Sequence, residues 1–193
     1  IHWNDEDVIP DVFKIEDENN DVVWHYNHVT QTMISYKGAT GSSVDLVVPK
    51  EVTYEGQTYP VLALEQDTFS GMTRHFNTVT FEGGNLTELP AYILNNSKIG
   101  EVILPDGIKS IGSNAFANST LSSVNLPEGL TLLGISAFQG TKLTEITLPS
   151  TLKDIGGSAF KNGTGLTTVV FPENITSIQG EAFSGCNLTG EII

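Results

Sequence analysis

The chain repeats one apolar pattern every 22 or 23 residues. Residues 143–160 read LTEITLPSTLKDIGGSAF, which generalises to L-x-x-I-x-L-P-x-x-L-x-x-I-G-x-x-A-F. Copies begin at Ile99, Leu121 and Leu166, and a more divergent copy begins at Phe76. Self-similarity at this spacing is typical of a solenoid, in which each repeat contacts only its neighbours. The sequence therefore predicts a row of stacked coils and not a closed globular core.

The first half of each copy has the alternation of a β-strand. In residues 143–149 we expect Ile146 and Leu148 to point inward, and Glu145, Thr147 and Pro149 to point outward. Such strands, stacked in parallel about 4.8 Å apart, would form a ribbon along the concave face of the solenoid. A proline follows most of these strands and ends each one, because it has no N–H to donate to the ladder. These prolines are Pro49, Pro105, Pro127, Pro149 and Pro172.

The second half of each copy carries an Ala-Phe pair, which predicts a file of phenylalanine rings at the outer bend. Two residues after each such position the chain has only glycine or asparagine, the two residues that enter the left-handed region at least cost. Each coil is therefore predicted to turn there with positive φ, as at the end of a short helical turn. The predicted ring file is Phe116, Phe138, Phe160 and Phe183, and the predicted turn residues are Gly71, Asn96, Asn118, Gly140, Asn162 and Gly185.

The N-terminal part does not follow the repeat. Residues 1–21 hold eight acidic residues against one lysine and are predicted to be a solvated acidic leader or linker, although residues 12–15 are compatible with the start of a strand. Residues 22–43 predict a β-hairpin that caps the open end of the solenoid. Residues 44–193 would then be repeats, with a hairpin-sized insertion at 50–59 and a last unit that stops within its strand. That interrupted unit leads us to expect that the natural protein continues further.

The repeated motif resembles the BspA-like leucine-rich repeats of bacterial surface proteins, including the Gly185-Cys186 pair that follows the last aromatic residue. The resemblance covers roughly residues 31–193, with departures at Gly83-Gly84, Leu89-Pro90 and Gln179. It implies a leucine-rich-repeat solenoid with a parallel β ribbon on the concave face and short turns or 3-10 helices on the convex side. It also implies a secreted or surface-anchored, non-enzymatic protein that mediates adhesion or host interaction.

Charge excludes several partners. The net charge is −14 with a single arginine, Arg74, so the chain lacks the clustered basic residues that bind nucleic acid or an anionic membrane. No apolar run approaches the roughly 18 residues that a membrane-spanning helix needs. We therefore predict no nucleic-acid partner and no membrane insertion of this fragment.

No catalytic, cofactor or metal residue is predicted. Asp17-x-Asn19-x-Asp21 has the first spacings of a calcium-binding EF-hand loop. Val22 and His28 replace the required glycine and glutamate, so the sequence predicts a polar turn here and not a calcium site. His25 and His28 would point to opposite faces of a strand. Cys186 has no histidine near it in sequence and is predicted to be a buried or turn thiol.

The predicted partner is a protein, such as a host or extracellular-matrix protein, and the predicted location is extracellular or on the cell surface. The outward strand positions form the candidate binding face, and they include no Trp, Tyr or Arg, the residues that usually dominate interface energetics. A protein-binding adhesion domain and a structural spacer that holds other domains away from the envelope therefore both remain open, with an enzyme a distant third. The candidate partner-binding residues are Asp45, Thr78, Thr80, Glu101, Ile103, Ser123, Asn125, Glu145, Thr147 and Thr168.

Overall fold

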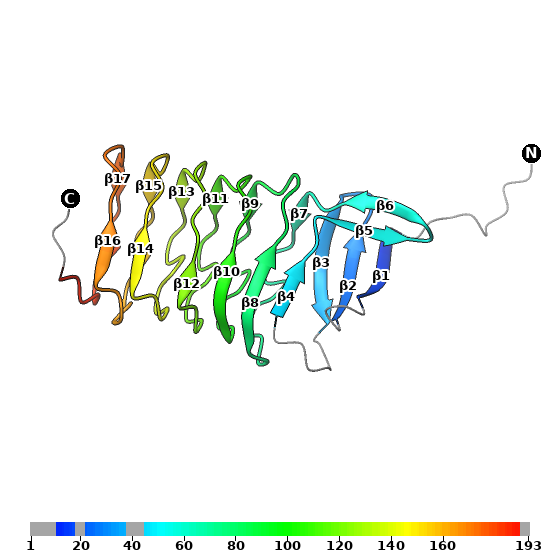
Figure 1. The fold of residues 1–193 in the computed structure, drawn as a ribbon, viewed down its shortest axis with the longest axis horizontal. Helices are drawn as coiled ribbons and strands as arrows, with labels where there is room; N and C mark the ends of the chain where they lie inside the picture. Colours follow the sequence, from blue (N-terminus) through cyan, green and yellow to red (C-terminus); the bar gives the residue numbers. More distant parts are fainter. Residues whose placement is uncertain (1–10, 18–21, 38–44, 190–193) are drawn as a thin grey trace, which may run out of the picture.

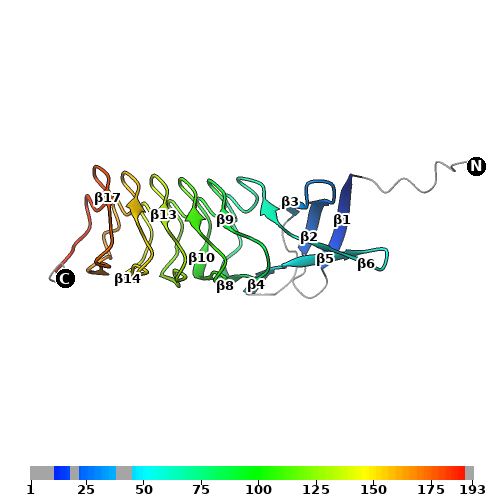
Figure 2. The same cartoon turned by 90° about the horizontal axis from the view of Figure 1, so that it is seen from above.

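The computed structural model describes residues 11–17, 22–37 and 45–189. Over these residues the chain forms an elongated β-solenoid, with the coils following one another along a single axis (Figures 1 and 2). Every regular element in the described ranges is a β-strand, so turns and not 3-10 helices make the convex side. The predicted leucine-rich-repeat solenoid is confirmed.

A first ribbon runs along one side of the solenoid. Its parallel strands are β4 (Asp45–Val48), β8 (Phe76–Phe81), β10 (Ile99–Ile103) and β12 (Ser123–Val124), followed by a separate pair, β14 (Glu145–Thr147) and β16 (Thr168–Val170). Alternate residues of these strands are buried and exposed, as the sequence predicts. One detail was predicted wrongly: Pro149 is buried, because β14 ends at Thr147 and the alternation of buried and exposed residues does not continue beyond it.

A second ribbon lies opposite the first. It consists of the two-residue strands β9 (Glu88–Leu89), β11 (Ser110–Ile111), β13 (Leu132–Leu133), β15 (Asp154–Ile155) and β17 (Ser177–Ile178), paired in parallel without interruption. Their second residues fill the core, and Leu133 and Ile155 are fully buried. In β17, which is the outermost strand, Ile178 is 49% exposed.

The rings predicted to form a file do so. Consecutive centroids of Phe116, Phe138, Phe160 and Phe183 are 5.1, 5.3 and 5.1 Å apart, with planes within 17° of parallel. The backbone repeats with them, since the N–H groups of Phe116, Phe138 and Phe160 each donate to the alanine carbonyl of the next coil, at 2.7 Å from Phe138 to Ala159. Both the rings and the backbone therefore connect the coils at this corner.

Each coil turns through two left-handed residues at the same corner. All six predicted glycine and asparagine positions have positive φ, between 54° at Asn96 and 76° at Gly185. A second left-handed residue lies four positions earlier in every coil, and it was missed because no one residue type fills this position. This second column is Asp67, Tyr92, Asn114, Ser136, Ser158 and Glu181, with φ between 56° and 62°.

A four-stranded sheet closes the N-terminal end of the solenoid. The predicted hairpin is present as β2 (Val22–Asn27) and β3 (Thr32–Lys37), and β3 pairs in parallel with β7 (Ala63–Leu64). β1 (Val12–Asp17), which lies in the range predicted as an acidic leader, pairs with β2 and buries Phe13 completely. The division of the chain into leader, cap and repeats stays a prediction.

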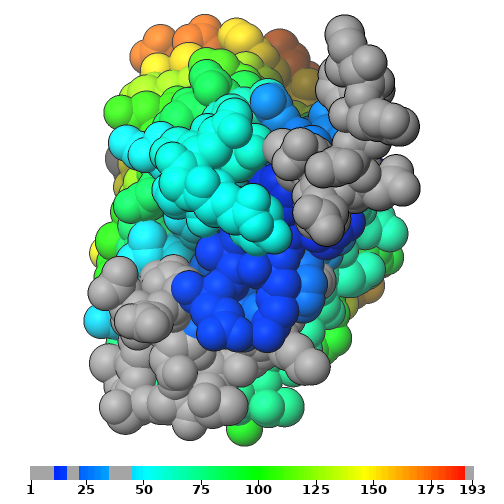
Figure 3. Space-filling view, turned by 90° about the vertical axis from the view of Figure 1, so that its right-hand side faces the viewer, coloured from blue at the N-terminus to red at the C-terminus, as the bar shows by residue number. Residues whose placement is uncertain are grey.

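The insertion in the first coil is a hairpin of β5 (Glu51–Tyr54) and β6 (Gln57–Pro60), as its length predicts. Its turn residues, Glu55 and Gly56, both have positive φ, which a two-residue hairpin turn requires. The hairpin and β1 lie side by side at the end of the molecule (Figure 3). Phe13 stacks on Tyr54 of the hairpin with centroids 4.1 Å apart, so the insertion completes the cap.

Candidate binding face

The structure places the predicted partner-binding residues along one surface, which we call the ribbon face. It comprises the outward residues of β4, β8, β10, β12, β14 and β16, together with Asn125 directly after β12. Strand register aligns them in columns: Glu101 lies beside Thr78 on one side and Ser123 on the other, and Glu145 lies beside Thr168. These residues thus share one face of the first ribbon, whereas their role in binding stays a prediction.

Apolar and acidic groups share the ribbon face. Ile103 is 40% exposed and Val170 is 51% exposed, although each lies in a strand whose neighbouring residue is buried. The acids bridge adjacent strands, since the Thr78 N–H donates to Asp45 Oδ1 at 3.2 Å and the Ser123 hydroxyl donates to Glu101 Oε1 at 3.3 Å. The face therefore combines fixed negative charge with exposed aliphatic surface.

Asn125 has a structural role that the sequence did not reveal. Its Oδ1 accepts the Leu104 N–H at 2.8 Å, and its Nδ2 donates to the Leu104 carbonyl at 3.1 Å. The side-chain amide thus continues the ladder where the backbone pairing of β10 and β12 ends. A substitution at Asn125 would disturb two coils, so this residue is a poor probe of binding.

A groove crosses the ribbon face between β12 and β14. It has a volume of about 490 Å³ and is lined by residues 122–126 and Glu128 of one coil and by residues 144–147 and Pro149 of the next. The first ribbon is interrupted here, because β12 ends one sheet and β14 begins another. The sequence could not show this groove, since the residues on both sides fit the repeat.

Further acids line the edge of the ribbon face where the strands end. Asp106, Glu128 and Glu173 each follow the proline of their coil, and all three side chains are exposed. Glu128 also connects two coils, because its carboxylate accepts the Ser150 N–H at 3.1 Å and the Ser150 hydroxyl at 2.7 Å. This edge therefore adds negative charge beside the groove.

The thiol of Cys186 lies where the repeat elsewhere has a buried hydroxyl. Ser119 and Thr141 donate to the phenylalanine carbonyl three residues before them, whereas Gly163 has no side chain with which to do so. Cys186 Sγ donates to the Phe160 carbonyl at 3.1 Å instead. Burial raises the pKa of this thiol above its usual 9.0, which makes it a weak nucleophile at neutral pH.

The described residues meet the requirements of neither a metal site nor a membrane-spanning helix. The described residues contain no group of three or more His, Cys, Asp or Glu side chains placed to hold a metal ion. His28 instead stacks on Phe13 with ring centroids 4.9 Å apart. The EF-hand-like spacing falls mostly at 18–21, outside the described residues. No helix that could cross a membrane occurs in the described part of the chain.

Comparisons with solved structures place the fold among bacterial leucine-rich repeat proteins. A leucine-rich repeat protein from Bacteroides ovatus is similar over 94% of this chain and 45% of its own, with 25% identity and a TM-score of 0.71. A leucine rich cell surface protein from Faecalibacterium prausnitzii matches over 92% of this chain and 47% of its own, with 23% identity and a TM-score of 0.66. The leucine rich repeat protein of T. pallidum matches over 90% and 80%, with 22% identity and a TM-score of 0.73.

The chain thus spans less than half the length of the first two of these proteins. No curated protein matches it. The family model described as the BspA type leucine rich repeat region matches residues 87–193 in 6 copies, which is more than half of the sequence. This match agrees with the stacked coils, the phenylalanine file and the left-handed turns described above. The chain belongs to the BspA-type leucine-rich repeat family.

Proposed function

We propose that this chain is a non-enzymatic, cell-surface repeat domain that binds a protein partner through its ribbon face. Membership of the repeat family and the name of the Faecalibacterium prausnitzii cell surface protein support this role and location. The proposed partner is a host or extracellular-matrix protein. The acidic surface, with a net charge of −14, favours a partner with basic groups over nucleic acid.

The observation that carries the proposal is the alignment of exposed side chains along the ribbon face. Strand register fixes the spacing of these side chains, and the second ribbon and the phenylalanine file hold the coils together behind them. A surface fixed in this way loses little conformational entropy when it binds. Because the face repeats, many weak contacts can add up to useful affinity without a single aromatic anchor.

The proposal is tested by screening the domain against extracellular-matrix and envelope proteins in a surface binding assay. Glu101→Lys and Thr147→Lys place a cation on exposed ribbon-face positions, whereas Glu88→Lys places one on the second ribbon as a matched control. We expect the two ribbon-face variants to weaken binding by about tenfold or more, as hot-spot positions do, and the control to bind like the parent. A partner that is indifferent to both ribbon-face variants would place the binding site elsewhere.

A structural spacer is the second candidate, and one observation favours it. The outward residues of the six ribbon-face strands include no Trp, Tyr or Arg, the usual anchors of an interface. A spacer would need only the rigid stack and no partner. Failure to find any saturable ligand, with the domain shown to be folded, would favour the spacer.

A further inference from the structure

The groove between β12 and β14 is an opening in an otherwise continuous stack. Behind it the same two coils remain joined, because Leu132 and Leu133 pair with Asp154 and Ile155. The rings of Phe138 and Phe160 also stack across the same boundary at 5.3 Å. Only the ribbon face is interrupted, so the groove has a rigid base.

The groove changes the burial of the aliphatic residues beside it, as a comparison with equivalent residues of the preceding coil shows. Val102 and Leu104 in the preceding coil are 0% and 3% exposed, whereas the equivalent Val124 and Leu126 are only half-buried. The groove therefore has an aliphatic floor that no neighbouring strand covers. Its rim carries Glu128 and Glu145 and the hydroxyls of serine and threonine, and no Lys, Arg or His contributes to the lining.

The two rim carboxylates differ in availability. Glu128 accepts both the N–H and the hydroxyl of Ser150, so its oxygens are already engaged between coils. The carboxylate of Glu145 is exposed and has no hydrogen-bond or ion-pair partner among residues 45–189 or in the described cap. It is therefore the rim acid that can receive a ligand.

An aliphatic floor below an acidic rim matches the chemistry of one type of side chain. Lysine and arginine pack their methylene stems on apolar surface while the charged end stays at the water boundary. Arginine adds a planar pair of donors that fits a carboxylate. The facing edges of β12 and β14, which do not pair with each other, can hydrogen-bond an extended backbone.

We infer that the β12–β14 groove is a docking site for an extended, basic segment of a protein partner, which places an arginine or lysine stem on Val124 and Leu126 and its charge at Glu145. This inference rests on the proposed function and narrows it to one site and one partner chemistry. A partner that lies evenly along the ribbon face would need no such groove.

The test uses a synthetic octapeptide, Gly-Ser-Thr-Arg-Thr-Arg-Ser-Gly, and the same peptide with both arginines replaced by glutamine. Titrations are followed by NMR of the backbone amides of the full chain. With the arginine peptide we expect saturable chemical-shift changes at residues 123–126 and 144–147, and an affinity that falls as salt is added. The glutamine peptide should bind at least about fivefold more weakly.

Two variants localise the effect, with a matched control. Glu145→Gln should weaken the arginine peptide by about fivefold or more, and Ser123→Lys should block it by placing a cation in the mouth of the groove. Glu88→Gln removes an exposed carboxylate from the second ribbon, outside the ribbon face, and should alter affinity less than about twofold. Far-UV circular dichroism and thermal melting check that each variant is folded.

The outcomes separate this inference from the broader proposal. Absence of saturable shifts, equal binding of both peptides, or equal effects of Glu88→Gln and Glu145→Gln would overturn the groove as a basic-segment site. The broader proposal would survive that result if a protein partner still lost affinity with Glu101→Lys and Thr147→Lys. If no protein partner responds to those variants, the proposed ribbon-face function fails independently of the peptide result.

Discussion

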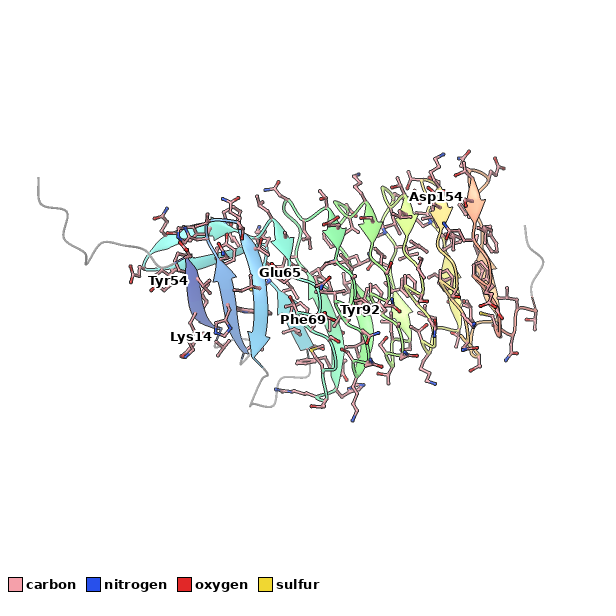
Figure 4. All side chains as sticks on the ribbon, turned by 180° about the vertical axis from the view of Figure 1, so that it is seen from behind. Lys14, Tyr54, Glu65, Phe69, Tyr92 and Asp154 are labelled. Atoms are coloured by element: carbon pink, nitrogen blue, oxygen red, sulfur yellow. The ribbon has the colours of Figure 1, made fainter. Side chains whose placement is uncertain are left out.

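The coils and the cap bury aromatic rings in different ways. Along the coils, equivalent phenylalanines stack nearly parallel, at 4° between Phe138 and Phe160. Where the cap meets the first coil, Phe69 instead meets Trp24 edge-on at 86° and 5.9 Å. Figure 4 shows Phe69 at this junction and Tyr54 farther out on the cap.

The difference follows from how each region is built. Identical coils related by one translation place identical side chains in the same orientation, so parallel stacking results from repetition. The cap brings unlike segments together, β1 with β2 and with the inserted hairpin. Around Phe13 its rings therefore range from stacked, at 2° with His28 and 9° with Tyr54, to edge-on, at 65° with Tyr59. In the coils each contact is local and repeated, whereas in the cap each contact is unique.

The largest expected effect is on stability, and the coils and the cap should differ in which segments lose protection from hydrogen exchange. Phe138→Ala and Phe13→Ala each remove a fully buried ring and should cost about 3–5 kcal/mol of unfolding free energy in denaturant titrations. Hydrogen exchange should then rise in the coils on both sides of residue 138, but for Phe13→Ala it should rise in β1, β2 and the hairpin. Equal exchange patterns in both variants would mean that the whole chain unfolds as one unit.

The second prediction tests how closely the coils approach. A Cβ at Gly134 would lie 2.6 Å from the backbone of Gly112 and Ser113 in the preceding coil. Gly134→Ala should therefore cost about 1–3 kcal/mol, because the two backbones must separate. Gly180→Ala is the control: a Cβ there meets nothing within 4 Å, and its φ is not positive, so stability should stay the same or rise slightly. Similar melting temperatures for both variants would contradict the close approach.

Repetition explains which parts of the fold could be predicted from sequence. An equivalent position can be recognised in the sequence when every coil fills it with the same or a similar residue type, as in the phenylalanine file and at Asn118 and its equivalents. The second left-handed column was missed because Asp67, Tyr92 and Ser136 share no residue type, although each takes the same φ. Residues 12–15 are compatible with the start of a strand in the sequence, but the charge around them led to the prediction of an acidic leader, so the complete burial of Phe13 was not predicted.

The groove shows the limit of the same reasoning for the candidate site. The residues of the ribbon face follow from strand alternation, and the structure aligns them. Val102 and Val124 occupy equivalent positions and are the same residue type, yet only one of them is fully buried. Their difference arises from how adjacent coils pair and not from the identity of either residue, so sequence alone could not reveal it.

The third prediction concerns a contact that exists only in the cap. The Tyr26 hydroxyl donates to the Pro60 carbonyl and thereby ties β2 to the inserted hairpin. Tyr26→Phe removes the donor and should lower the free energy of unfolding by about 1 kcal/mol.

Burial raises the pKa of Tyr26 above its usual 10.0, so the folded state favours the neutral phenol. Its contribution is full below pH 10.0 and is lost as pH rises through the folded pKa. Melting curves between pH 8 and pH 11 should show this loss in the parent and not in the variant, whereas the same loss in both would exclude Tyr26 as its source.

The smallest expected effect compares two exposed ion pairs. Lys161 and Glu181 join adjacent coils at 2.6 Å, whereas Lys14 and Glu16 join two residues of β1 at 2.8 Å. The hydrogen bond and charge of each lysine lower the pKa of its glutamate below 4.5, so each stabilisation is present above pH 4.5 and is lost as pH falls through the lower folded pKa.

Exposure and screening keep both effects small, but their structural settings differ. Breaking the pair between coils removes a restraint on their separation, while breaking the pair within β1 leaves the ladder to β2 in place. Glu181→Gln should therefore lower the melting temperature at pH 6 slightly more than Glu16→Gln, and both differences should shrink as pH falls below 4.5 and through the lowered folded pKa of each glutamate. The two ion pairs have the same chemistry and similar length. Equal shifts in melting temperature would therefore mean that an exposed ion pair stabilises the fold no more when it joins adjacent coils than when it lies within one strand.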